Sequence, residues 1–209
     1  MIECIYHVIE PDSPLPRHWL MPDELQYLDG VSSKRQYEFC YGRALVRSYL
    51  CTQRQIPFHD VIISLPTGTA PELSVAGLDY PLSISHSGNA IGVAIGVAIG
   101  VVIGGAISAD QAVGLDIERM KKRRYLSDFY KQFGIFKEVP KSLVDFYQTW
   151  TAGEAYSKLS GTPLLQVLAE PLPTQLLTEH RQLDDIMLCL CYRKPANINW
   201  HLIAQLPDR

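Results

Sequence analysis

The chain has 209 residues, of which 47% are hydrophobic and 20% charged, and its formal net charge is −3. This length buries a sizeable core, in one large domain or two small subdomains. The slightly acidic balance gives no general signal for nucleic acid or a membrane surface as a partner. Five cysteines, none in a CxxC pair, favour a reduced, cytoplasmic protein. The acids and prolines among the first 20 residues predict no signal peptide.

The first 90 residues are expected to combine short strands with one long helix. Apolar runs bounded by proline, glycine or polar residues predict strands at 2–9, 61–65 and 81–87, with loops at 11–22 and 67–72. A helix is expected over 23–51, with a cap at Ser32 or Ser33. A spacing of 3.6 residues predicts its core-facing stripe, which consists of Tyr37, Cys40, Tyr41, Ala44, Leu45 and Ser48.

The uncharged run at 90–107 allows two interpretations. Its length, and a glycine at every fourth position over 92–104, are typical of a transmembrane helix with a small-residue stripe. Its bulky residues, however, fall on odd positions, and this period of two predicts a strand with one bulky and one small face. We favour one or two strands built on a Gly-Val-Ala-Ile repeat, with a turn near Gly100 or at 104–105, and expect no membrane span.

The second half predicts a strand, two helices and two closing strands. In chain order these are a strand at 113–118, helices at 121–137 and 145–160, and strands at 186–193 and 198–204. Cys189 and Cys191 are expected to lie buried on one face of their strand. The repeated order of helix and strands indicates an α+β chain of two halves, 1–108 and 109–209, joined near 105–112.

Two carboxylates alternate with apolar residues in the predicted strand at 113–118. Asp116 and Glu118 are two positions apart, so they share one face, while the apolar residues between them point into a core. Carboxylates on one face repel each other unless a cation lies between them, and hard oxygen ligands suit Mg²⁺. A strand face with two solvated acids is the alternative.

Two further polar groups are candidates for a site. Glu154 and Lys158 lie one turn apart on the predicted helix at 145–160, where they form either an ordinary surface ion pair or part of a site. Ser85, His86 and Ser87, followed by Gly88, lie at the end of a predicted strand, where the histidine and the two hydroxyls form either a phosphate pocket or a loop cap.

Taken in order, these segments resemble the 4′-phosphopantetheinyl transferase superfamily. The resemblance rests on S-H-S at 85–87, G-L-D-I-E at 114–118 and W-T-A-G-E-A-Y-S-K at 150–158. It spans roughly residues 30–162, and the chain is most similar to the larger, pseudo-dimeric type. The expected fold is therefore α+β, with two pseudo-symmetric α/β subdomains that each pack a helix on a small antiparallel sheet.

The resemblance implies a holo-[acyl-carrier-protein] synthase. Such an enzyme transfers the 4′-phosphopantetheine group of coenzyme A to a carrier-protein serine and releases adenosine 3′,5′-bisphosphate. The resemblance also implies that Asp116, Glu118 and Glu154 bind Mg²⁺. Glu154 and Lys158 are the implied catalytic residues, and the serine proton is taken either by a carboxylate near the metal, Glu154 or Glu138, or by a metal-bound water. The residues implied to contact coenzyme A are Lys34, Arg35, Ser85, His86 and Lys158.

An acidic acyl or peptidyl carrier protein is the implied macromolecular partner, and a monomer is expected because one chain contains both halves. The basic run at 119–124 follows the metal-binding strand directly. Most such runs are simply solvated, but this one is suited to steer an acidic partner toward the site.

The chain departs from the family pattern at two lysines. Gly153 stands where the helix motif usually has lysine, and 68–71, Gly-Thr-Ala-Pro, replaces a G-K-P loop with Thr69 near the lysine position. Each loss removes a phosphate contact worth on the order of 1–3 kcal/mol if buried. An active enzyme is the favoured interpretation, and a non-catalytic or weakly active protein that binds coenzyme A or a carrier protein is the alternative.

Overall fold

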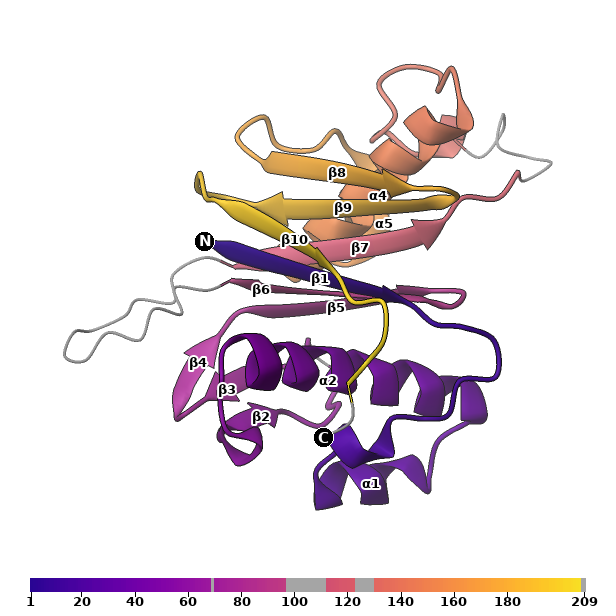
Figure 1. The fold of residues 1–209 in the computed structure, drawn as a ribbon. Helices are drawn as coiled ribbons and strands as arrows, with labels where there is room; N and C mark the ends of the chain where they lie inside the picture. Colours follow the sequence, from indigo (N-terminus) through magenta and orange to yellow (C-terminus); the bar gives the residue numbers. More distant parts are fainter. Residues whose placement is uncertain (69, 97–111, 123–129, 208–209) are drawn as a thin grey trace.

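The computed structural model describes residues 1–68, 70–96, 112–122 and 130–207. Over these residues helices pack on small sheets, which confirms the predicted α+β class (Figure 1). Two long helices, α2 (Ser33–Gln53) and α4 (Leu143–Ser160), cover the outer faces of two sheets that pack on each other. Among these residues no helix is long and apolar enough to span a bilayer.

The first sheet has the strand order β10-β1-β6-β5. Its strands are β1 (Ile2–Val8), β5 (Leu82–Ser87), β6 (Ala90–Gly96) and β10 (Ile198–Leu202). The β1–β6 and β6–β5 pairs are antiparallel, whereas β10 runs parallel to β1. The last strand of the described chain therefore lies beside the first, and β5 forms one edge of the sheet.

Strand β6 has the two unlike faces that its period of two predicts. Its odd positions, from Ile91 to Ile95, are buried in a core cluster with α2, whereas its even positions, from Ala90 to Ala94, face the second sheet. A Cβ added at Gly92 would lie 3.0 Å from Cδ2 of Leu115. The small face therefore lets the second sheet pack closely. The expected turn within 100–105 lies outside the described residues.

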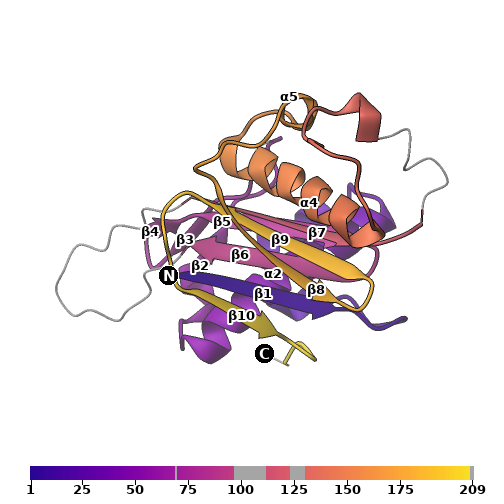
Figure 2. The same ribbon diagram turned by 90° about the horizontal axis from the view of Figure 1, so that it is seen from above.

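The second sheet has the order β7-β9-β8 and is antiparallel throughout. Its strands are β7 (Val113–Arg119), β8 (Leu177–Leu183) and β9 (Ile186–Tyr192). Figure 2 shows α4 lying along this sheet. Cys189 and Cys191 are both buried on the face of β9 that packs against α4, as predicted, and Leu188 and Leu190 face the first sheet.

Smaller elements complete the described fold. They are α1 (Pro22–Leu28), β2 (Val61–Ile63), β3 (Leu73–Val75), β4 (Leu78–Tyr80), α5 (Leu164–Ala169) and 3₁₀ turns at Arg17–Trp19, Phe58–Asp60 and Tyr130–Gln132. Strands β2, β3 and β4 form a separate antiparallel sheet.

The prediction of one helix over 23–51 is wrong in one respect, because two helices occupy this segment. Helix α1 ends at Leu28, and α2 begins anew after Ser32, whose hydroxyl accepts a hydrogen bond from the backbone N–H of Arg35. A serine that satisfies the first backbone donors of a helix fixes the starting residue. Of the two caps expected from the sequence, the structure selects Ser32.

Of the helix expected over 121–137, residues 123–129 lie outside the described residues, and the described remainder contains the 3₁₀ turn at Tyr130–Gln132 and a loop. The loop is fixed against α5 because the N–H of Ile135 donates to the carbonyl of Leu168. A Cβ on Gly134 would overlap the carbonyl oxygen of Ala169. At residues 133–137, packing against α5 thus holds a loop where the sequence predicted helix.

Candidate metal centre

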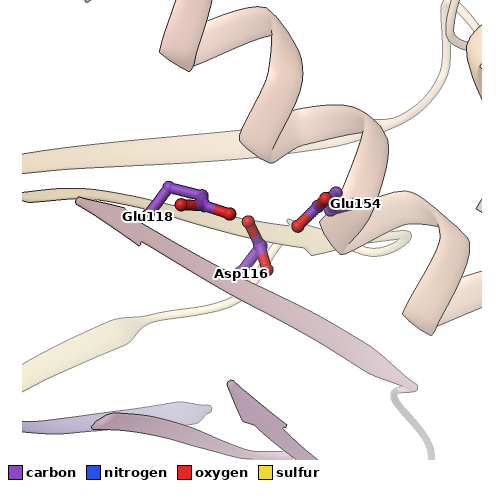
Figure 3. A group of neighbouring side chains, drawn as sticks. All are labelled: Asp116, Glu118 and Glu154. Atoms are coloured by element: carbon purple, nitrogen blue, oxygen red, sulfur yellow. The ribbon is translucent and has the colours of Figure 1, made fainter. Parts of the chain in front are cut away.

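Strand β7 presents its carboxylates to α4. Val113, Leu115 and Ile117 are buried against the first sheet, so Asp116 and Glu118 lie on the opposite face of the strand. Figure 3 shows the carboxylate of Asp116 between those of Glu118 and of Glu154 from α4. One ligand atom from each of the three lies within 4.8 Å of the others.

A glycine allows the strand and the helix to approach closely enough for this cluster. A Cβ on Gly114 would overlap the carbonyl oxygen of Ala155 and would lie 2.8 Å from the amide nitrogen of Leu159. Helix α4 therefore crosses β7 in backbone contact at Gly114. This crossing places Glu154 beside Asp116, which is two positions further along the strand.

The two oxygens of Asp116 have different environments, although the residue is only 1% exposed. Oδ1 accepts hydrogen bonds from the Ser85 hydroxyl at 3.0 Å and from Lys158 Nζ at 2.8 Å. Oδ2 is buried and has no hydrogen-bond donor. A buried carboxylate oxygen without a donor is costly. A divalent cation shared with Glu118 and Glu154 would satisfy it, so the donor set fits a hard metal ion.

The pKa of Glu154 is shifted by the same group of buried carboxylates. Burial, followed by the neighbouring carboxylate of Asp116, raises the pKa of Glu154 to about 8. Without a cation, the cluster therefore relieves its repulsion by keeping a proton on Glu154 near neutral pH, and that proton can be donated to Asp116. A proton and a metal ion are thus alternative ways to satisfy the same group of oxygens.

Lys158 lies one helical turn beyond Glu154 and is fully engaged within the protein. Its Nζ donates to Oδ1 of Asp116, to the Ser85 hydroxyl at 2.9 Å and to the carbonyl of Leu115 at 3.0 Å. An ammonium group has three donor hydrogens, and these bonds account for all of them. Lys158 therefore orients Asp116 in this structure and would contact a phosphate only by giving up one of these bonds.

His86 lies on the other face of β5 from Ser85 and lines a cavity of about 130 Å³ beside α2. Arg35 and Arg43 also line this cavity, and Glu38 lies 3.3 Å from Nε2 of His86. Burial lowers the pKa of His86, and the charge of Glu38 opposes that effect. Glu38 lines the cavity as well, and the guanidinium of Arg43 is paired with Glu24, so Arg35 and His86 are the groups placed to contact an anionic ligand.

A second cavity, of about 640 Å³, is lined by Lys158, the residue that contacts Asp116. Leu159, Val113, Asp79 and Tyr80 also line it. Pro71 lines both cavities, so the two are neighbours across the loop that precedes β3.

Several residues predicted to act lie apart from the cluster. The side chain of Lys34 is 87% exposed and forms an ion pair with Glu38 at 3.7 Å. Glu138 lines a separate cavity with Phe136 and Asp145. Gly153 does not face the acids, because a Cβ there would lie 2.8 Å from Cδ1 of Ile135 and 2.9 Å from Cδ2 of Leu168.

The basic run at 119–124 is divided in its roles. Arg119 is engaged with Asp185 and Asn89, each at 2.6 Å. Lys121 and Lys122 are exposed, and the two arginines that follow lie outside the described residues. Over the described part of the run, the lysines are thus the residues available to a partner.

Ser87 has a different contact from the phosphate pocket or loop cap predicted for it. Its hydroxyl donates to Oε2 of Glu118 at 2.8 Å, a contact that the sequence pattern did not predict. A signal was present, because serines alternate at 83, 85 and 87 just as the acids alternate at 116 and 118.

Comparison with known proteins adds no assignment to this geometry. No protein-family model matches the chain, and no match was found among curated proteins. The site is therefore defined by its own contacts. Asp116, Glu118 and Glu154 converge from β7 and α4, Ser85 and Lys158 hold Asp116, and these residues form a candidate divalent-cation centre.

Proposed function

We propose that this chain is a 4′-phosphopantetheinyl transferase of the larger, pseudo-dimeric type. The observation that carries the proposal is the convergence of Asp116, Glu118 and Glu154, with the buried Oδ2 of Asp116 lacking a donor. These acids belong to the strand and helix motifs on which the resemblance rests. The packing of α2 and α4 on two adjoining sheets supports the expected pair of α/β halves.

Asp116, Glu118 and Glu154 would hold Mg²⁺. When bound, the ion offsets negative charge on the pyrophosphate of coenzyme A and on the leaving group. Ser85 and Lys158 fix Oδ1 of Asp116, so that Oδ2 stays directed at the neighbouring carboxylates. The protein thus pays the cost of assembling the ligands during folding rather than at each turnover.

Coenzyme A would lie with its nucleotide phosphates near His86 and Arg35, which line the smaller cavity. The carrier serine oxygen forms a bond to the β-phosphorus, and the bond from that phosphorus to the bridging oxygen breaks. Adenosine 3′,5′-bisphosphate leaves, and the serine proton passes to a base. Of the two candidate bases, Glu154 lies in the carboxylate cluster and Glu138 lines a separate cavity, which favours Glu154.

A mass measurement tests the proposed activity. The protein is incubated with an apo-carrier protein, Mg²⁺ and coenzyme A, and the carrier is weighed. Transfer of the arm adds about 340 daltons, the value set by its formula under phosphoryl-transfer chemistry. Asp116→Asn is the matched control, because it keeps the size and hydrogen bonds of the side chain but removes its charge, and it should abolish the gain.

The alternative, a binding protein without turnover, has one observation in its favour. The three donors of Lys158 are all engaged, and Gly153 packs against apolar side chains, so neither position offers a free cation to phosphates. Coenzyme A binding measured by calorimetry without any mass gain on the carrier would support that alternative.

A further inference from the structure

Three serines of β5 join the two sheets through side-chain hydrogen bonds. The hydroxyls of Ser83, Ser85 and Ser87 accept hydrogen bonds from successive outward-facing N–H groups of β7. These bonds come from the amides of Leu115, Ile117 and Arg119, at 2.9, 3.1 and 3.0 Å respectively. We call these residues the serine ladder. It takes the place of a backbone ladder, because β5 and β7 are edge strands of different sheets.

The rungs of the serine ladder differ in where each hydroxyl hydrogen goes. The hydroxyl of Ser83 donates to the carbonyl oxygen of Leu115, the same residue whose amide it accepts from, at 3.5 Å. Ser85 donates to Oδ1 of Asp116 at 3.0 Å, and Ser87 donates to Oε2 of Glu118 at 2.8 Å. Two of the three rungs therefore hold carboxylates of the candidate metal centre, and the first rung contacts only backbone.

We propose that Ser85 and Ser87 are positioning residues that set Asp116 and Glu118 as metal ligands. The inference rests on the proposed metal centre and assigns to these serines a task distinct from contact with coenzyme A. A hydroxyl that accepts from a rigid backbone amide is fixed in direction, so its hydrogen reaches one oxygen of the neighbouring carboxylate. Hydrogen bonds behind metal ligands orient them and raise affinity.

The Ser85 rung explains why the two oxygens of Asp116 differ. The Ser85 oxygen accepts from Ile117 and from Lys158 while donating to Asp116, so all its hydrogen-bonding positions are used. This arrangement turns Oδ1 toward β5 and leaves Oδ2 without a donor. Ser85 is 3% exposed, so water does not replace the hydroxyl readily.

The test compares three matched variants, Ser83→Ala, Ser85→Ala and Ser87→Ala. Each removes one hydroxyl and leaves one β7 amide without its acceptor, so all three should lower the melting temperature, and Ser85→Ala should lower it most because its hydroxyl also contacts Lys158. Binding of Mn²⁺ alone is measured by the loss of the free-ion paramagnetic resonance signal. Ser85→Ala and Ser87→Ala should weaken Mn²⁺ binding by on the order of tenfold. Ser83→Ala should bind Mn²⁺ as the unmodified protein does.

A rescue variant separates an effect on carboxylate position from a general weakening of the contact between β5 and β7. Ser87→Thr keeps the hydroxyl at a half-buried position and should restore Mn²⁺ affinity. Equal Mn²⁺ affinity in Ser83→Ala, Ser85→Ala and Ser87→Ala would overturn the inference, whether that affinity is normal or reduced. Failure of the unmodified protein to bind Mn²⁺ would instead remove the proposed metal centre itself.

Discussion

At the scale of single residues, each oxygen of Asp116 has a different task. Oδ1 is held by Ser85 and Lys158, whereas Oδ2 is buried among carboxylates without a donor. Folding concentrates negative charge here, and the raised pKa of Glu154 is the electrostatic consequence. A centre of this kind sacrifices some stability for binding, as functional sites often do.

The pH dependence of stability follows from Glu154. With its pKa raised to about 8 in the folded protein, against an ordinary value of 4.5, the folded state binds more protons between these pH values. Stability of the metal-free protein should therefore fall as pH rises from about 5 to 9. Glu154→Gln should reduce this fall, and so should added Mn²⁺. Melting curves across the pH range measure it, and an unchanged slope in Glu154→Gln would contradict the assignment.

Placing lysine at position 153, as in the transferase pattern that the chain resembles, should not raise the proposed activity. The added side chain would meet Ile135 and Leu168 rather than the acids. Gly153→Lys should therefore lower the free energy of unfolding by about 1–3 kcal/mol through overpacking. Denaturant unfolding and the carrier mass assay measure the two effects, with Gly153→Ala as the smaller change. A gain in activity for Gly153→Lys would show that position 153 does face the ligand.

At the scale of elements, the crossing of α4 over β7 builds the centre. Strand β7 has two close neighbours there. It meets α4 through backbone contact at Gly114, and it meets β5 through the serine ladder. The small face of β6 allows this by letting Leu115 pack closely over Gly92. The Gly-Val-Ala-Ile pattern over 90–96 thus has a structural role in bringing the two sheets together.

Gly114→Ala tests the crossing. The added methyl group would overlap backbone atoms of α4, which cannot rotate away as a side chain does. We expect a loss of at least about 1–3 kcal/mol in unfolding free energy and weaker Mn²⁺ binding, because Glu154 moves away from Asp116. Gly30→Ala is the control, since its methyl group would meet nothing within 4 Å. Equal effects of the two substitutions would contradict the close approach.

The elements with strong periodicity could be predicted from the sequence, and the contacts between them could not. The helix at 145–160 and the alternation of Asp116 and Glu118 follow from local pattern. Strands β3 and β4, of three residues each, are too short to show a period. Strand β8 is partly solvent-exposed and polar, so it was missed as well. The pairing of the 83–87 serines with β7 depends on how two sheets pack, which local sequence does not specify.

At the scale of the whole molecule, charge should govern the encounter with a carrier protein. Lys121 and Lys122 are exposed directly after the strand that carries two of the acids. Lys121→Glu with Lys122→Glu should slow carrier modification on the order of tenfold at low salt. Coenzyme A binding should be unchanged, because neither lysine lines the cavity that holds His86.

The control is the same comparison at high salt. Screening there should bring the carrier-modification rate of the double variant close to that of the unmodified protein. Loss of coenzyme A affinity in the double variant would contradict the assignment of these lysines to the carrier. It would place the basic run at the nucleotide instead.

The proposed function requires that three acids from β7 and α4 hold one divalent ion that also contacts coenzyme A. Crystals grown with Mn²⁺ and coenzyme A, measured at a wavelength where manganese scatters anomalously, would locate that ion. We expect one strong anomalous peak among the carboxylates of Asp116, Glu118 and Glu154, with phosphate oxygens on its open side. Bound coenzyme A with no manganese at these carboxylates, or manganese held elsewhere, would contradict it.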